Sequence, residues 1–197
     1  MRELVVATGN QGKLRELELL LHGTVEHLYS LRDYPGIPPV LEDGITFEEN
    51  AIKKARTVAV ATGKPTIADD SGLVVNALDG QPGVYSARFA GEDATDDDNN
   101  RKLLALMADV PDNCRSARFQ CVIAYCLPDG ACRKFSGELR GVLLKEPRGK
   151  DGFGYDPLFL VPEYGKTLAE LPLHLKNRVS HRGCALGEFL SYIKEAG

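Results

Sequence analysis

The chain has 197 residues, a mass of 21.5 kDa and a formal net charge of −4, and 43% of its residues are hydrophobic. This size and composition suit one domain over residues 1–197, or two small lobes that share one core. Charges of both signs are mixed along the chain, so it lacks the basic stripe that long nucleic acids require. The composition therefore argues against polymeric DNA or RNA as a partner.

The N-terminal residues show no targeting signal and no membrane segment. Met1–Ala7 lead directly into an apolar run, without the charged and then apolar pattern of a signal peptide. Nowhere does the sequence contain about 18 consecutive apolar residues, the length that a membrane-spanning helix needs. We expect a cytoplasmic protein that does not associate with membranes.

The five cysteines are expected to be free thiols. Their number is odd, and they lack the paired C-x-x-C spacing of zinc sites. Disulfides are also rare in a reducing compartment such as the cytoplasm. The residues concerned are Cys114, Cys121, Cys126, Cys132 and Cys184.

The first structural pattern is a strand, a glycine loop and a helix. Leu4–Ala7 is a short apolar run, Thr8–Lys13 contains two glycines, and leucines recur at helical spacing over residues 14–21. Glycines let backbone N–H groups approach a ligand, the helix N-terminus adds a partial positive charge, and Lys13 adds a full one. The segment suits a phosphate group, and the same pattern also occurs as a plain structural joint.

Two adjacent carboxylates, Asp69 and Asp70, stand at the end of the apolar segment Thr66–Ala68. A second short strand is predicted after them, at Leu73–Val75. Like charges at the end of a buried strand repel each other and lose solvation, unless a cation compensates them. The pattern therefore indicates a divalent metal.

Capping signals define two further helices. Thr46 and Glu49 form a capping-box pattern before a helix that Gly63 ends. Thr95 caps a helix to about Met107, whose first-turn acids compensate the helix dipole, with a metal site as the alternative. The other predicted elements are strands at Arg115–Leu127, Cys132–Leu144 and Leu158–Val161, a hairpin turn at Pro128–Gly130, a short helix near Thr167–Leu171 and a last helix capped by Ser180. The two long strands should lie near the centre of an extended sheet.

Together these parts meet the needs of a nucleoside triphosphate with magnesium. Lys13 and its loop suit phosphates, and Phe153 suits stacking on a base. Glu42, Asp69 and Asp70 offer oxygen ligands to Mg²⁺, which usually shares one or two carboxylates with substrate phosphates. A carboxylate could also polarise a water for attack on phosphorus.

Other nucleotide-binding patterns fit less well. Residues 7–13 approximate the P-loop pattern G-x-x-x-x-G-K, but Ala7 replaces its first glycine and Leu14 stands where a Ser or Thr holds magnesium. The dinucleotide-binding pattern G-x-G-x-x-G fits less well still, since Gly9-x-x-Gly12 lacks its glycine triplet. No spacing indicates a Cys or Ser nucleophile paired with His.

Six motifs occur in the order in which the inosine/xanthosine triphosphate pyrophosphatases carry them. The sequence resembles this family of non-canonical purine nucleotide pyrophosphatases over essentially its whole length. The motifs are Thr8-Gly9-Asn10-x-x-Lys13, Thr46-Phe47-x-Glu49-Asn50-Ala51, Ala68-Asp69-Asp70-Ser71-Gly72-Leu73, Pro82-Gly83-Val84-Tyr85-Ser86-Ala87-Arg88, Gly152-Phe153-Gly154-Tyr155-Asp156-Pro157 and Ser180-His181-Arg182.

The resemblance implies an α/β fold with a long mixed β-sheet flanked by helices, two lobes around a central substrate cleft, and a homodimer. It implies hydrolysis of ITP, dITP and XTP to the monophosphate and pyrophosphate, which removes deaminated purines from the nucleotide pool. The implied cofactor is Mg²⁺, with Mn²⁺ as the alternative metal.

The resemblance also assigns roles by position. Glu42 and Asp70 would bind the metal, and Asp70 would be the general base. Gln11 fills a variable place, so it would act mainly through its backbone. The other roles are phosphate binding by Thr8, Gly9, Asn10, Gln11, Gly12 and Lys13, substrate contact by Ser71, one wall of the base pocket from Phe153, Gly154, Tyr155 and Asp156, and purine reading by Lys176, His181 and Arg182.

Purine reading by cationic donors has a physical rationale. Hypoxanthine and xanthine carry an oxygen at C6 where adenine carries an amino group, so Lys176 and Arg182 would favour the former. Guanine shares this oxygen, so its exclusion must depend on its 2-amino group. The residues before Lys176 depart from the family, in which acids are common there, and we expect His174 to be a surface residue rather than a ligand.

Several alternatives stay open. Lys54 either reaches the phosphates or lies on a solvated helix face. Adjacent strand residues point to opposite faces, so Asp69 should face away from Asp70 and accept hydrogen bonds from backbone or basic groups. A pyrophosphatase for modified pyrimidine nucleotides is disfavoured by Phe153 and Ser180–Arg182. A nucleotide-binding regulatory module without turnover is disfavoured by the intact acids.

Overall fold

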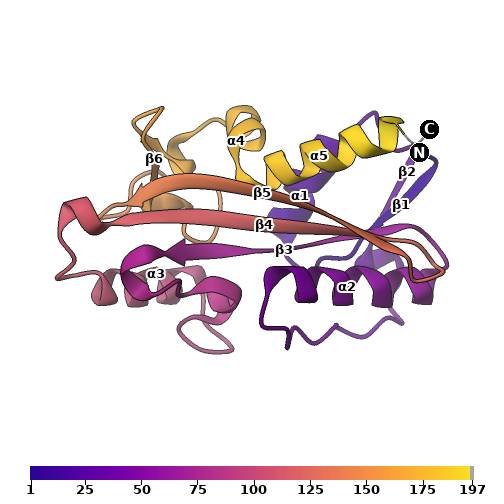
Figure 1. Cartoon of the computed structure of the whole chain (residues 1–197), viewed down its shortest axis with the longest axis horizontal. Helices are drawn as coiled ribbons and strands as arrows, with labels where there is room; N and C mark the ends of the chain where they lie inside the picture. Colours follow the sequence, from indigo (N-terminus) through magenta and orange to yellow (C-terminus); the bar gives the residue numbers. More distant parts are fainter. Residues whose placement is uncertain (196–197) are drawn as a thin grey trace. The chain divides into compact units, whose positions relative to one another are not determined.

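The computed structural model describes residues 1–195 and consists of a mixed β-sheet flanked by helices (Figure 1). The strands are β1 (Glu3–Val6), β2 (His27–Ser30), β3 (Thr66–Val75), β4 (Ser116–Cys126), β5 (Cys132–Leu143), β6 (Phe159–Val161) and β7 (Lys166–Thr167). The α-helices are α1 (Gln11–Leu21), α2 (Phe47–Thr62), α3 (Asp96–Leu106), α4 (Leu173–Val179) and α5 (His181–Glu195).

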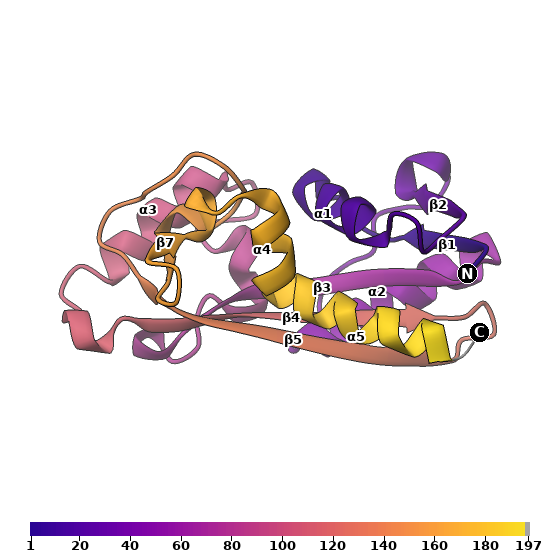
Figure 2. The same cartoon turned by 90° about the horizontal axis from the view of Figure 1, so that it is seen from above.

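The described strands form one seven-stranded sheet in the order β2-β1-β3-β4-β5-β6-β7. Strand β1 is parallel to β2 and β3, whereas β6 is antiparallel to β5 and β7. Figure 2 shows β2 beside β1 near the N-terminus. The sheet is therefore mixed, as expected, and β4 of the predicted hairpin is its middle strand.

The chain divides into two compact units, each built from separate segments. The first contains Met1–Asp70, Cys121–Gly137 and the described residues from His181 onward; the second contains Ser71–Gln120 and Glu138–Ser180. Strands β3, β4 and β5 contribute residues to both units. In β3 the division falls between Asp70 and Ser71.

The core of the first unit has two layers, one on each face of its strands. Leu4, Val6 and Ile67 pack with apolar residues of α1 and α5, whereas Val5 and Ala68 pack with the alanine-rich face of α2. This alternation is the two-residue period of a β-strand. Figure 1 shows α5 and α2 on opposite faces of these strands.

Helix α2 begins and ends where its capping signals predict. The Thr46 hydroxyl accepts a hydrogen bond from the Glu49 N–H at 3.1 Å, and Gly63 ends the helix in the left-handed conformation with φ 66°. The Glu49 carboxylate accepts from Ile45 N–H rather than from Thr46 N–H. The cap therefore satisfies exposed N–H groups, but not in the strict capping-box pattern.

Strand β3 corrects the prediction of two short strands around the acidic pair. It is one continuous strand, and nine of its ten residues are buried. Asp is usually depleted in strands, but packing and charge partners override this weak preference. Strands β2 and β7 and helix α4 were not predicted, and the segment Leu168–Glu170 is a 3₁₀ turn at the position of a predicted short helix.

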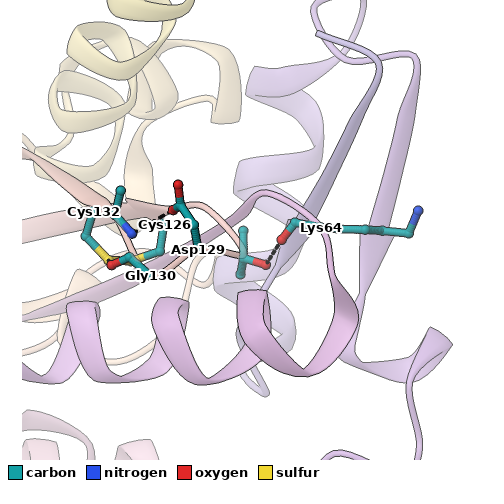
Figure 3. Close-up of a disulfide and its surroundings, with 7 residues drawn as sticks. Lys64, Cys126, Asp129, Gly130 and Cys132 are labelled. Carbon is teal, nitrogen blue, oxygen red and sulfur yellow. Dashed lines mark hydrogen bonds between the residues drawn. A yellow bond between two sulfur atoms is a disulfide. The ribbon is translucent and has the colours of Figure 1, made fainter.

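Cys126 and Cys132 form a disulfide (Figure 3), so the prediction of free thiols is wrong for this pair. They are the last residue of β4 and the first of β5, with their Cα atoms 4.1 Å apart. Between them the hairpin turn closes through a hydrogen bond from Leu127 N–H to Ala131 O at 2.8 Å. The other three cysteines are free, as predicted: Cys114, Cys121 and Cys184.

No helix within residues 1–195 is both long enough and apolar enough to cross a bilayer.

Candidate active site

Asp69 and Asp70 lie in the interior of β3 and point to opposite faces of it. Both are nearly inaccessible, at 1% and 5% exposure. Their partners come from different helices: Lys13 of α1 and Arg182 of α5 for Asp69, and Lys54 of α2 for Asp70. The prediction that Asp69 faces away from Asp70 and meets basic groups is confirmed.

Asp69 is held by two cations. Lys13 Nζ lies 3.1 Å from Asp69 Oδ2, and Arg182 donates to the same oxygen through Nε and Nη2, each at 3.1 Å. Burial alone would raise the pKa of Asp69, but Lys13 and Arg182 outweigh it and hold that pKa far below its usual range. Asp69 is therefore an ionised counter-ion that positions Lys13.

Arg182 has a second carboxylate partner, Glu16, which the sequence did not reveal. Arg182 Nη1 donates to Glu16 Oε2 at 2.5 Å, and both side chains are buried. Burial disfavours the charged guanidinium, but Asp69 and Glu16 raise the pKa of Arg182 above its ordinary value. The only local signal was the position of Glu16, three residues after Lys13 on the same helix face.

Lys54 lies between two carboxylates on the other face of β3. Its Nζ is 2.9 Å from Glu42 Oε1 and 3.3 Å from Asp70 Oδ1, and its side chain is only 11% exposed. The alternative of a solvated helix face is therefore wrong for Lys54. Burial lowers the pKa of Lys54, but Asp70, Asp69 and Glu42 together raise it above its ordinary value.

Asn50 connects the Glu42 loop to Asp70. Its Oδ1 accepts from Gly44 N–H at 2.8 Å, and its Nδ2 donates to Asp70 Oδ2 at 3.2 Å. A Cβ at Gly44 would lie 2.7 Å from Asn50 Oδ1, so only glycine allows this approach. Sequence reasoning placed Asn50 in a motif but gave it no role.

The acids Glu42 and Asp70 fit the oxygen-ligand chemistry of a divalent metal. Burial raises the pKa of Asp70, and Glu42 raises it further, whereas Lys54, Lys13 and Asn50 lower it. Mg²⁺ needs only one or two protein carboxylates when substrate phosphates complete its shell. Within residues 1–195 no group of three or more His, Cys, Asp or Glu is placed to hold a metal by itself.

The predicted phosphate loop comprises residues 8–10 and the first turn of α1, and its own side chains fix it. Asn10 Oδ1 accepts from Lys13 N–H at 3.0 Å and caps the helix, and Thr8 Oγ1 accepts from Asn10 N–H at 3.2 Å. The Gln11 side chain contacts Arg32 and the Gly9 carbonyl. The N-terminus of α1 is thus held in a defined conformation, and a helix N-terminus favours anions such as phosphate.

A second group of predicted residues lies in the second unit. Asp156 accepts from Phe153 N–H at 3.0 Å and from the Lys176 ammonium, and that ammonium lies 4.7 Å from the centre of the Phe153 ring. Tyr155 donates to Ser86 O at 2.8 Å, and burial raises the pKa of its phenol. A Cβ at Gly152 would lie 2.1 Å from Asp156 Oδ2, so this turn requires glycine.

The structure thus brings the predicted residues together in two sets. Thr8–Lys13, Glu42, Asp70 and the buried His181 and Arg182 belong to the first unit, and Ser71, Phe153–Asp156 and Lys176 to the second. Lys176 is 3% exposed, although it is charged. His174 is exposed, as expected for a surface residue.

A model described as the Ham1 family matches residues 4–192 of the sequence. The chain belongs to the Ham1 family. The dITP/XTP pyrophosphatase of Geobacter sulfurreducens is 61% identical over 186 residues, which cover 94% of each chain. The dITP/XTP pyrophosphatase of Escherichia coli K12 is 50% identical over 196 residues, which cover 98% of this chain and 99% of that protein.

The fold agrees with solved Ham1 structures. The structure of a HAM1 protein from Coxiella burnetii covers 99% of this chain and 100% of its own, with a TM-score of 0.89 and 43% identity. The α/β fold with a long mixed sheet is thus confirmed, and so is the resemblance on which it was first based.

Proposed function

We propose that this Ham1 protein hydrolyses ITP, dITP and XTP to the nucleoside monophosphate and pyrophosphate. The observation that carries the proposal is the pair of carboxylates, Glu42 and Asp70, that share the largely buried Lys54 ammonium. The names of relatives such as the Geobacter sulfurreducens dITP/XTP pyrophosphatase supply the substrate class. The protein would thereby remove deaminated purines from the nucleotide pool.

Asp70 is the proposed general base. Its pKa is raised mainly by burial, which strengthens the carboxylate as a proton acceptor compared with an exposed one. It would take the proton from the water that attacks the phosphoanhydride, and pyrophosphate would leave. Asn50 donates to one oxygen of Asp70 and so orients the other, near Lys54.

Glu42 and Asp70 are the proposed ligands of Mg²⁺, with Mn²⁺ as the alternative. The metal would supply charge neutralisation at the phosphates. Thr8, Gly9, Asn10, Gln11 and Gly12 would bind phosphate oxygens through the N-terminus of α1, and Lys13, held by Asp69, would add a fixed positive charge.

Lys176, His181 and Arg182 are the proposed purine readers, with Phe153, Gly154, Tyr155 and Asp156 as a wall and Ser71 as a further contact. The position of Lys176 over Phe153 supports a role beside a stacked base. Arg182 is fixed by Glu16 and Asp69, and a guanidinium carries five N–H donors in one rigid plane. Donors facing C6 would favour hypoxanthine and xanthine over adenine.

We further propose a cytoplasmic homodimer in which residues 1–197 act as one catalytic domain. Each compact unit is assembled from separate chain segments, which supports a single domain. Light scattering coupled to size-exclusion chromatography tests the dimer: a mass near twice 21.5 kDa supports it, and a monomer contradicts it.

The function is tested by pyrophosphate release from a panel of nucleotides in Mg²⁺. We expect release from ITP, dITP and XTP far faster than from ATP, GTP or modified pyrimidine triphosphates. Equal rates of pyrophosphate release from all purine triphosphates would contradict the proposed preference for deaminated purines. Calorimetric binding of ITP without any product would instead identify a regulatory module.

A further inference from the structure

Both backbone polar groups of Gly154, its N–H and its carbonyl, are bound by side chains of α3. Gly154 N–H donates to Asp96 Oδ2 at 2.7 Å, and Gly154 O accepts from Asn100 Nδ2 at 2.9 Å. All three residues belong to the second unit. We propose that Asp96 and Asn100 are positioning residues for base recognition. Their two hydrogen bonds to Gly154, called the clamp below, hold the loop that carries Phe153 and Asp156.

The spacing on α3 suits this role. Asp96 and Asn100 are four residues apart, so they lie one above the other on the same helix face. A single glycine residue can therefore be held between two consecutive helical turns. The charge of Asp96 also strengthens its hydrogen bond, since bonds to an ionised acceptor are stronger than neutral ones.

Helix α3 is itself firmly placed in the second unit. Thr95 and Asp98 form a complete capping box at its first turn. The buried Asn99 accepts from Ala90 N–H at 2.8 Å and donates to Ala87 O at 3.1 Å. The clamp therefore rests on a helix with a defined start and a fixed neighbouring segment.

The clamped residue lies where the loop turns. Gly154 has φ 61°, between Phe153, whose N–H is held by Asp156, and Tyr155, whose hydroxyl is held by Ser86. The two bonds from Asp96 and Asn100 add a direct restraint on the backbone N–H and carbonyl of Gly154. The Phe153 ring beside Lys176 thus depends on α3 for its place.

Sequence reasoning gave the acids of residues 96–98 a different meaning, compensation of the helix dipole. The structure separates them: Asp98 caps the helix, whereas Asp96 and Asp97 are both exposed and Asp96 accepts a hydrogen bond from Gly154 N–H. Asp96 and Asp97 share the first turn, so removal of either has the same effect on the dipole. Asp97 is therefore a matched control for Asp96.

The proposal rests on the proposed function, in which Phe153 and Asp156 face the base. We would measure kcat and KM for XTP and GTP with D96A, N100A and the isosteric N100D, against D97A and wild type. Loss of one clamp bond should raise the KM for XTP about three- to tenfold, with a smaller change in kcat and a lower preference for XTP over GTP. N100D should have the largest effect, since it turns a carboxylate oxygen toward the Gly154 carbonyl.

Amide exchange of Gly154, followed by NMR, gives a readout that is independent of turnover. We expect faster exchange of this amide in D96A than in D97A, with equal melting temperatures for the two variants. If wild type releases no pyrophosphate from XTP, the proposed function fails. If wild type is active but D96A, N100A and N100D match D97A in KM, base preference and Gly154 exchange, the clamp is wrong while the function stands.

Discussion

Arg182 donates from two nitrogens to a single oxygen of Asp69, each at 3.1 Å, and both side chains are buried. The carboxylate of Glu16 completes the group on the far side of the guanidinium. Since Asp69 also holds Lys13, a proposed phosphate ligand depends on a largely buried charge network. Lys13 is held by Asp69, Asp69 by Arg182, and Arg182 by Glu16, which lies 166 positions before it in the chain.

Replacing Arg182 by Leu should destabilise the protein strongly. The change removes the cation that two buried carboxylates share, Glu16 and Asp69, so that Asp69 keeps only its pair with Lys13. Breaking a buried ion pair typically costs about 3–5 kcal/mol. Urea denaturation measures the loss of unfolding free energy. The control is Arg101→Leu, which breaks an exposed pair with Asp98 and should cost less than about 1 kcal/mol. Equal losses of unfolding free energy in the two variants would show that the buried network stabilises the protein no more than an exposed ion pair does.

Replacing Asp70 by Asn should abolish turnover but preserve the fold. The amide keeps the shape of the side chain but cannot act as the base or neutralise a metal, so kcat should fall by about two or more orders of magnitude. Because burial raises the pKa of Asp70, a neutral side chain at this position should not lower the melting temperature. Pyrophosphate release and thermal denaturation measure the two effects. Substantial turnover would refute Asp70 as the base.

Replacing Gly137 by Ala should disturb the start of α5. A Cβ at this position would lie 2.0 Å from His181 O and 2.6 Å from Ala185 N, so the helix must move. Such overpacking typically costs about 1–3 kcal/mol, and the KM for XTP should rise because His181 and Arg182 move with the helix. Gly187→Ala is the control, since a Cβ there meets no heavy atom within 4 Å. That variant should be as stable as wild type or more stable.

The thiols should differ in their pH-dependent reactivity. Burial raises the pKa of Cys121 to about 12, so its reactive thiolate is absent from the folded protein at pH 8. Partial burial, assisted by Glu188, also raises the pKa of Cys184. Alkylation of the folded protein should therefore label Cys114 first, Cys184 more slowly and Cys121 last, as mass spectrometry can determine.

The same shift has a consequence for stability. An unfolded thiol titrates near pH 8.5, at about its ordinary pKa. The folded Cys121 holds its proton to about pH 12, so its contribution to stability is present below pH ~8.5 and is lost progressively as the pH rises.

The disulfide can be tested by counting thiols. Denatured protein should show three reactive thiols without reductant and five with it, because the Cys126–Cys132 disulfide must first be reduced. Five thiols in both samples would contradict the disulfide.

Local patterns were sufficient for much of the fold. Thr46 and Thr95 cap their helices as predicted, and the two-residue period of β3 correctly separates Asp69 from Asp70. Strand β2 was missed because its four residues are partly or fully exposed and lack the alternation of a buried strand. The continuity of β3 was missed because the cations that pair with its two acids come from α1, α2 and α5, which are distant from β3 in the sequence or lie on separate elements.

The candidate site was predictable only where a residue stands in a motif. Glu16 and Asn100 act through partners far away in the sequence, Arg182 and Gly154, which local spacing does not reveal. The disulfide likewise depends on the exact pairing of the two hairpin strands, which sequence separation alone does not define. Long-range contacts, rather than propensities, determine each of these features.

Because Lys54 lies between Glu42 and Asp70, the free protein carries its own counter-ion. If Glu42 and Asp70 bind a metal as proposed, we therefore expect folding not to depend on that metal, in contrast to a zinc finger, which unfolds when a chelator removes its zinc. The melting temperature should be the same in EDTA as in MgCl₂. Lys54→Met would abolish this independence, so that the variant should melt lower in EDTA than in MgCl₂. In the proposed mechanism, Lys54 would thus keep the free protein folded until metal and nucleotide bind together.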